Sequence, residues 1–335
     1  MKILAIQFRY FGDAALLTPA LRALKEHYPS AAVHALVPEE VAPLFQHLPC
    51  LTRVWAMPRT RGRACLRQSW PVLRALRRER FDHSVDFGGN DRGAILSLLC
   101  GARERLGPRR AGGFIGRRFC YTRTIIPADL NQHEIRRNLH IISVWNVPPP
   151  RSLDLELHSD PALDNFAKKI MPERRIVCHL ATTQPKKEWP LQHWAALFDL
   201  ASAVGLKLVF STGTGPREQS LLEQFRKLAP MAPVLSAVPE LAAFLAVLKR
   251  AELFISGDTG PLHFAAGLGV PTVSLFGATS AMLWAPLGAQ HQRVQGSPCS
   301  CDGNTGVCSA AQPCMATISP QEVLSRIQAS RTSVG

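Results

Sequence analysis

Four short segments of the chain combine glycine, hydroxyl and charged residues in an order that could bind phosphate or move a proton. The first contains Gly12 and Asp13, directly after the apolar run Lys2–Phe8. Gly12 permits a tight turn, and Asp13 stands at the start of the next helical stretch. A carboxylate in this position could accept the proton of an attacking hydroxyl group. The alternative is that Asp13 only caps the helix by accepting hydrogen bonds from free backbone amides.

The second segment, His179–Pro190, places hydroxyl groups and lysines directly after another apolar run. Thr182, Thr183 and Lys187 could bind a diphosphate, because hydroxyl, amide and ammonium groups all donate to phosphate oxygens. The alternative is that Lys186 and Lys187 form a solvated pair on a loop.

The third segment, Ser211–Glu218, is a glycine-rich turn that leads into a helical stretch. Glu218 falls in the first turn of that helix, where an acidic residue complements the helix dipole. It could instead accept hydrogen bonds from two neighbouring ribose hydroxyls.

The fourth segment, Ile255–Gly269, ends one strand and begins a helix near Pro261, which needs no amide donor there. The free amides of Thr259 and Gly260, together with the helix dipole, would attract a pyrophosphate. His263 lies on an otherwise apolar helical face, and its alternative role is that of a buried structural histidine. No G-x-G-x-x-G follows the first apolar run, which counts against a dehydrogenase.

Strand-like runs alternate with helical stretches on both sides of a proline-rich junction at 147–150. This alternation indicates parallel sheets covered by helices on both faces. We therefore predict an α/β protein with two doubly wound, Rossmann-like domains that face a cleft, over residues 1–157 and 158–335. In such sheets ligands bind beyond the carboxyl ends of the strands, where all four segments fall. The predicted strands are Lys2–Phe8, Ala32–Val37, Asp82–Phe87, Arg175–Leu180, Leu206–Ser211, Leu253–Ser256 and Pro271–Phe276, and the predicted helices are Leu16–Tyr28, Leu191–Val204, Pro216–Leu228, Glu240–Arg250 and Pro261–Leu268.

Composition supports this organisation. The 335 residues exceed what one ordinary core accommodates, and 46% hydrophobic with 19% charged residues argues against disorder. No apolar run approaches the roughly 18 residues of a membrane-spanning helix. The first nine residues are too short and too soon interrupted for a signal peptide. We therefore expect a cytoplasmic protein.

The positive charge lies mainly in the first half of the chain. Residues 1–150 carry 23 Lys and Arg against 11 Asp and Glu, and 21 of these 23 basic residues are arginine. Residues 151–335 carry 16 Lys and Arg against 14 Asp and Glu. Nine arginines fall between Arg53 and Arg80, and seven between Arg103 and Arg123. Arginine suits phosphate and carboxylate groups and an anionic surface. No helix-turn-helix or zinc-finger spacing is present, so we predict no nucleic-acid partner.

The nine cysteines do not form an evident disulfide framework. Cys299, Cys301, Cys308 and Cys314 crowd one loop and could hold zinc or remain reduced thiols, and their role stays open. The chain has no D-x-D sequence to hold Mg²⁺ on a diphosphate, so we predict no metal and no cofactor.

Three of these segments resemble glycosyltransferase family 9, the ADP-heptose:lipopolysaccharide heptosyltransferases. The similar residues are Gly12-Asp13 with 17–21, Thr182-Thr183 with Lys187 and 189–190, and Asp258-Thr259-Gly260 with His263 and 275–279. The resemblance implies a GT-B fold and transfer that inverts the anomeric centre without a metal. It also implies ADP-heptose as donor, the lipopolysaccharide core as acceptor, and action at the inner face of the inner membrane.

The resemblance further implies a role for each site residue. Asp13 would be the general base, and Lys187 with Thr182 and Thr183 would bind the diphosphate. Glu218 would bind the ribose, Asp258 the donor sugar, and the amides of Thr259 and Gly260 the phosphate. The first domain would bind the acceptor and the second the nucleotide sugar. The alternatives are a GT-B transferase that uses another nucleotide sugar and a non-catalytic GT-B scaffold that binds anionic glycolipid.

Overall fold

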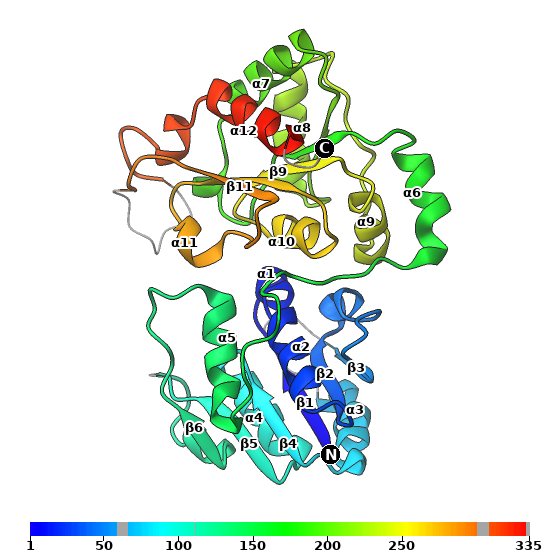
Figure 1. Cartoon of the computed structure of the whole chain (residues 1–335), viewed down its shortest axis with the longest axis vertical. Coiled ribbons are helices and arrows are strands. Elements are labelled where there is room, and N and C mark those ends of the chain that lie inside the picture. The colour runs from blue at the N-terminus through cyan, green and yellow to red at the C-terminus, as the bar shows by residue number, and fades with distance from the viewer. Residues whose placement is uncertain (59–65, 111, 300–307, 333–335) are drawn as a thin grey trace. The chain divides into compact units, whose positions relative to one another are not determined.

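The computed structural model describes residues 1–58, 66–110, 112–299 and 308–332. The chain divides into two compact units, Met1–His158 and Ser159–Gly335. Each unit is built on one parallel β-sheet with helices packed on it (Figure 1). No helix among these described residues is long and apolar enough to cross a membrane.

The sheet of the first unit has six strands in the order β3-β2-β1-β4-β5-β6. Every pairing in it is parallel, and Ile6 at the end of β1 is in register with both Leu36 and Asp86. The strand order reverses direction at β1, so the crevice of this doubly wound sheet lies beyond the carboxyl end of β1. The strands are β1 (Lys2–Ile6), β2 (Ala32–Pro38), β3 (Arg53–Met57), β4 (His83–Asp86), β5 (Glu104–Pro108) and β6 (Arg123–Ile125). The helices are α1 (Phe11–Ala15), α2 (Thr18–His27), α3 (Leu66–Glu79), α4 (Asp91–Cys100) and α5 (Glu134–Ile142), with short 3₁₀ helices η1 (Glu39–Leu44), η2 (Arg117–Cys120) and η3 (Ser143–Trp145).

The sheet of the second unit has five parallel strands in the order β11-β10-β9-β7-β8. Its central strands β7, β9 and β10 are buried at every position, which is usual where helices cover both faces. The strands are β7 (Ile176–His179), β8 (Leu208–Ser211), β9 (Leu253–Gly257), β10 (Thr272–Phe276) and β11 (His291–Gln295). The helices are α6 (Asp164–Ile170), α7 (Leu191–Ala203), α8 (Pro216–Leu228), α9 (Leu241–Leu248), α10 (Gly260–Gly267), α11 (Ala281–Trp284) and α12 (Pro320–Thr332), with 3₁₀ helices η4 (Pro161–Leu163), η5 (Pro185–Lys187) and η6 (Cys314–Thr317).

The predicted α/β class with two Rossmann-like sheets is confirmed, and each predicted strand is present. The predicted helix Leu16–Tyr28 is wrong in its first turn. The chain there forms two helices, α1 and α2, and α2 begins only at Thr18 with Pro19 in its first turn. The predicted strands do not include β3, although its residues 54–57 are apolar, or β6, which has only three residues.

Candidate active site

In the first unit, Asp13 lies just beyond the carboxyl end of β1. It is the third residue of α1, its side chain is 5% exposed, and its Oδ2 accepts a hydrogen bond of 3.1 Å from the Tyr10 amide. Tyr10, with extended backbone, is the N-cap residue of this helix, so Asp13 does not occupy the N-cap position. Its carboxylate nevertheless caps the helix from the third position, because it accepts from the free Tyr10 amide. Gly12 precedes it, and the Gly12 carbonyl accepts from the Leu16 amide.

Charged groups surround the Asp13 carboxylate. Arg9 Nη1 lies 3.3 Å from Asp13 Oδ1 and 2.8 Å from Glu134 Oε1. Burial raises the pKa of Asp13 and the Glu134 charge adds to this rise, while Arg9, the Tyr10 amide and Arg110 lower it. A buried carboxylate with a raised pKa at the crevice of a doubly wound sheet is suited to accept a proton near neutral pH.

In the second unit, Lys187 and Asp258 form an ion pair. Lys187 ends η5 in the loop after β7, and its Nζ donates to Asp258 Oδ2 over 2.7 Å. The Thr279 hydroxyl donates to the same oxygen over 2.9 Å, and His263 Nε2 lies 4.0 Å from Asp258 Oδ1. Residues from three loops, each after a different strand of one sheet, thus meet at its carboxyl edge. His263 itself is buried in α10.

The loop after β7 packs tightly against the end of β9. A Cβ atom at Gly257 would lie 2.6 Å from the Lys187 carbonyl oxygen, so this close approach requires glycine. The Thr182 hydroxyl donates to the Gln184 carbonyl over 2.7 Å, whereas Thr183 is exposed. The interpretation of the two lysines as a solvated pair is wrong, because Lys186 is buried and Lys187 is paired with Asp258.

The helix α10 begins directly after Asp258. Thr259 is its N-cap residue, with extended backbone, and Gly260 is its first residue. The first amides of a helix have no intrahelical acceptor, so they can donate to an anion. The carboxylate of Asp258 thus lies next to the backbone amide donors of Thr259 and Gly260.

Glu218 lies in the first turn of α8 and accepts a hydrogen bond of 3.0 Å from the Gly215 amide. It also lies against Gly213, where a Cβ atom would collide with its carboxylate. Glu218 therefore holds the glycine-rich turn after β8 in shape, which is compatible with a ribose contact from the same carboxylate.

Sequence reasoning did not find several charged partners of these sites. The Glu188 carboxylate accepts hydrogen bonds from the Thr182 amide (3.1 Å) and from Arg217 Nη1 (2.7 Å). Arg217 Nη2 also donates a hydrogen bond to the Thr182 carbonyl. These contacts tie the loop after β7 to the start of α8. Glu188 and Arg217 stand inside the two segments singled out from the sequence, but their pairing spans 29 positions along the chain.

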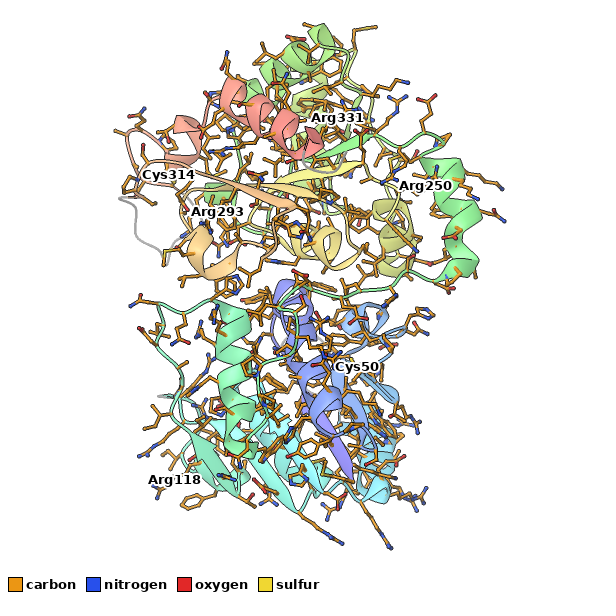
Figure 2. The ribbon with its side chains drawn as sticks, viewed as in Figure 1. Cys50, Arg118, Arg250, Arg293, Cys314 and Arg331 are labelled. Atoms are coloured by element: carbon orange, nitrogen blue, oxygen red, sulfur yellow. The ribbon has the colours of Figure 1, made fainter. Side chains whose placement is uncertain are left out.

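The cysteine loop is described only in part, because Cys301 lies outside the described residues, as do Arg59, Arg61 and Arg63. Cys314 begins η6 in the second unit (Figure 2) and is buried, and burial together with a hydrogen bond to Cys299 raises its pKa to about 11. Over the described ranges, no group of three or more His, Cys, Asp or Glu side chains could hold a metal ion.

Comparison with known proteins gives one consistent result. The sequence profile of glycosyltransferase family 9 (heptosyltransferase) matches residues 70–310. The chain is 23% identical to lipopolysaccharide heptosyltransferase 3 of Escherichia coli over 292 residues, which cover 83% of this chain and 84% of that protein. It is 26% identical to lipopolysaccharide heptosyltransferase 1 of Pseudomonas aeruginosa over 294 residues, which cover 84% of this chain and 79% of that protein.

Solved structures agree on the fold. A family 9 glycosyltransferase from Veillonella parvula superposes with a TM-score of 0.84 at 18% identity, over 99% of this chain and 97% of that one. The E. coli ADP-heptose lipopolysaccharide heptosyltransferase II superposes with a TM-score of 0.79 at 18% identity, over 99% of both chains. The two-sheet architecture is therefore the GT-B fold, and the chain belongs to glycosyltransferase family 9, the heptosyltransferases, and is a glycosyltransferase.

Proposed function

We propose that this enzyme transfers heptose from ADP-heptose to the inner core of lipopolysaccharide, with inversion at the anomeric carbon and without a metal ion. The observation that carries the proposal is the buried Asp13, whose pKa is raised, at the crevice of the first sheet. The names of the lipopolysaccharide heptosyltransferases to which the chain is similar support the choice of donor and acceptor.

The proposed reaction is a single displacement. A hydroxyl of the acceptor attacks the anomeric carbon of the heptose, and the bond from that carbon to the diphosphate oxygen breaks. ADP leaves with the electron pair of the broken bond, and the hydroxyl proton passes to the Asp13 carboxylate. Attack opposite the leaving group inverts the anomeric centre. General-base assistance of this kind contributes about 10²–10⁴-fold to the rate.

The second unit would bind the donor. Lys187 and the amides of Thr259 and Gly260 would donate to the diphosphate, and Asp258 would bind hydroxyls of the sugar. Five further residues complete the proposed site. Thr182 and Thr183 would contact the diphosphate, and Glu218 would contact the ribose. Gly12 lies next to Asp13, and His263 lies beside Asp258. Charge that grows on the departing diphosphate is then met by one ammonium group and the start of α10.

We also propose that the first unit rests on the anionic cytoplasmic face of the inner membrane. Exposed apolar side chains accompany exposed arginines around η2 and β6, where Arg118 lies at the edge of the unit (Figure 2). Each basic residue near an anionic leaflet contributes about 1 kcal/mol, and apolar side chains can enter the interface. The exposed apolar residues are Phe114, Ile115, Phe119, Ile126 and Leu130.

The membrane proposal is tested by reversing three exposed charges, Arg109→Glu, Arg118→Glu and Arg123→Glu, in one variant. Binding to vesicles that contain phosphatidylglycerol should weaken, and binding of the unreversed protein should fall as salt rises, since the attraction fades within about 10 Å at 0.1 M salt. The acceptor KM should rise while the Kd for ADP stays unchanged. Binding that is indifferent to both salt and the reversals would contradict the proposal.

Transfer itself is tested by incubating the enzyme with a heptose-deficient lipopolysaccharide core and either ADP-heptose or a UDP-sugar. The proposal predicts ADP release and a mass increase of one heptose on the acceptor. Transfer from the UDP-sugar alone would instead support the alternative that this fold uses another nucleotide sugar.

A further inference from the structure

We infer that Glu134 is a positioning residue, which accepts the hydrogen bond of Arg9 and so leaves Asp13 Oδ1 without a hydrogen bond and able to take the acceptor proton. This inference rests on the proposed role of Asp13. Glu134 lies 125 residues from Arg9 in the chain and belongs to the first unit, whereas the residues proposed for the donor belong to the second.

Asp13 Oδ1 is buried, and no hydrogen bond reaches this oxygen from the residues that the structure describes. Arg9 Nη1 lies only 3.3 Å away, yet its hydrogen bond goes to Glu134 Oε1 over 2.8 Å. The Arg9 charge stabilises this oxygen, but a buried polar atom without a hydrogen bond still costs about 1–3 kcal/mol, so other contacts must hold the arrangement. Glu134 supplies them by accepting the bond that Arg9 would otherwise give to Asp13.

Glu134 is itself held in place. It begins α5, and its side chain is 3% exposed. Its second oxygen, Oε2, accepts a hydrogen bond of 2.6 Å from Arg137 Nη1, one turn along the helix. The helix is fixed to the Asp13 region, because Asn138 Nδ2 donates over 3.2 Å to the carbonyl of Leu16, the C-cap residue of α1. Two charged donors, one on each oxygen, leave the Glu134 carboxylate little freedom to turn away.

The charges that face Asp13 come from three parts of the first unit. Arg9 follows β1, Arg110 follows β5, and Glu134 begins α5. Burial and Glu134 raise the pKa of Asp13, and the two arginines oppose them. If the charge of Glu134 is removed, the arginines act unopposed and Arg9 can donate to Oδ1. Both changes favour the deprotonated carboxylate and make Asp13 a weaker base.

The test is Glu134→Gln in the full-length enzyme, with transfer from ADP-heptose measured against pH. Asp13 must be deprotonated to act, so activity rises with pH through its pKa. A lowered pKa moves this acid limb of kcat to lower pH, by roughly half to one unit. On the plateau kcat should fall about three- to tenfold, because a weaker base assists less, while the KM for ADP-heptose stays unchanged.

Two further variants separate the inferred effect of Glu134 on Asp13 from a general effect of removing a negative charge. Asp129→Asn removes one negative charge from the exposed segment before α5 and should leave the pH profile unchanged. In an Arg9→Met background, Glu134→Gln should lower kcat by less than it does alone, since only the direct effect of its charge on Asp13 remains and the part that passes through Arg9 is gone.

The inference is overturned if Glu134→Gln leaves the acid limb in place, if Asp129→Asn moves it equally, or if the effects of Arg9→Met and Glu134→Gln on kcat are fully additive. Any of these outcomes leaves the proposed function standing as long as Asp13→Asn lowers kcat by about 10²–10⁴-fold. Retained transfer by folded Asp13→Asn would show instead that the proposed base is wrong.

Discussion

Replacing Lys187 with methionine separates its proposed catalytic role from its structural one. Lys187 Nζ lies 2.7 Å from Asp258 Oδ2, and both side chains are largely buried, at 17% and 10% exposure. Without the lysine, the Asp258 carboxylate still accepts a hydrogen bond from the Thr279 hydroxyl but loses its charged partner. Removing one partner of a buried pair costs about 3–5 kcal/mol of stability, and we expect the lower end because Thr279 remains.

The effect on the reaction is expected to be independent of that loss. Lys187 would donate to the leaving diphosphate, and loss of one preorganised donor of this kind lowers kcat by about 10²–10³-fold. Asp258→Asn in the Lys187→Met background removes the uncompensated charge and should restore most of the lost unfolding free energy. It should not restore turnover, because the cation is still missing.

The assay is ADP release at a temperature well below the unfolding midpoint of each variant, with urea denaturation for stability. A matched control is Lys207→Met, since Lys207 pairs with Glu173 over 3.0 Å with both side chains more than half exposed. Loss of such a solvated surface pair should leave both stability and kcat nearly unchanged. A folded Lys187→Met enzyme with kcat near that of Lys207→Met would refute the proposed role.

Two other predictions concern the donor site. Gly257→Ala should lower stability by about 1–3 kcal/mol and weaken ADP binding, because its Cβ would lie 2.6 Å from the Lys187 carbonyl oxygen and 3.0 Å from Thr182 Cγ2. An unchanged melting temperature and an unchanged Kd for ADP would show that the loop can move without cost. Incubation with EDTA should leave the transfer rate unchanged, since Lys187 and the amides of α10 are proposed to meet the diphosphate charge; a large loss that Mg²⁺ restores would contradict this.

Local sequence patterns predicted those parts of the fold that depend on neighbouring residues. The buried strand Lys2–Ile6, the glycine at 12 and Asp13 are adjacent, so one segment contains the strand, the turn and the carboxylate. In the same way, α8 begins at Pro216 and ends at Leu228 as predicted, because proline favours a first helical turn.

The features of the fold and site that the sequence did not predict depend on contacts between distant segments. Lys187 and Asp258 are 71 positions apart, and their pairing follows from the adjacency of β7 and β9 in the sheet, which the sequence does not state. The charged strand β6 pairs along β5 although its own residues are mostly exposed. Lys186 and Lys187 look equivalent in the sequence, and only the short η5 turn places one in the interior and the other on Asp258.

The most direct test of the central claim is Asp13→Asn, measured as transfer of heptose from ADP-heptose to the core acceptor. Asparagine preserves the shape of the side chain and can still accept from the Tyr10 amide, so the turn after β1 should remain intact. The account predicts that kcat falls by about 10²–10⁴-fold while the Kd for ADP and the melting temperature stay close to those of the unsubstituted enzyme. Transfer at an undiminished rate by the folded Asp13→Asn variant would contradict it.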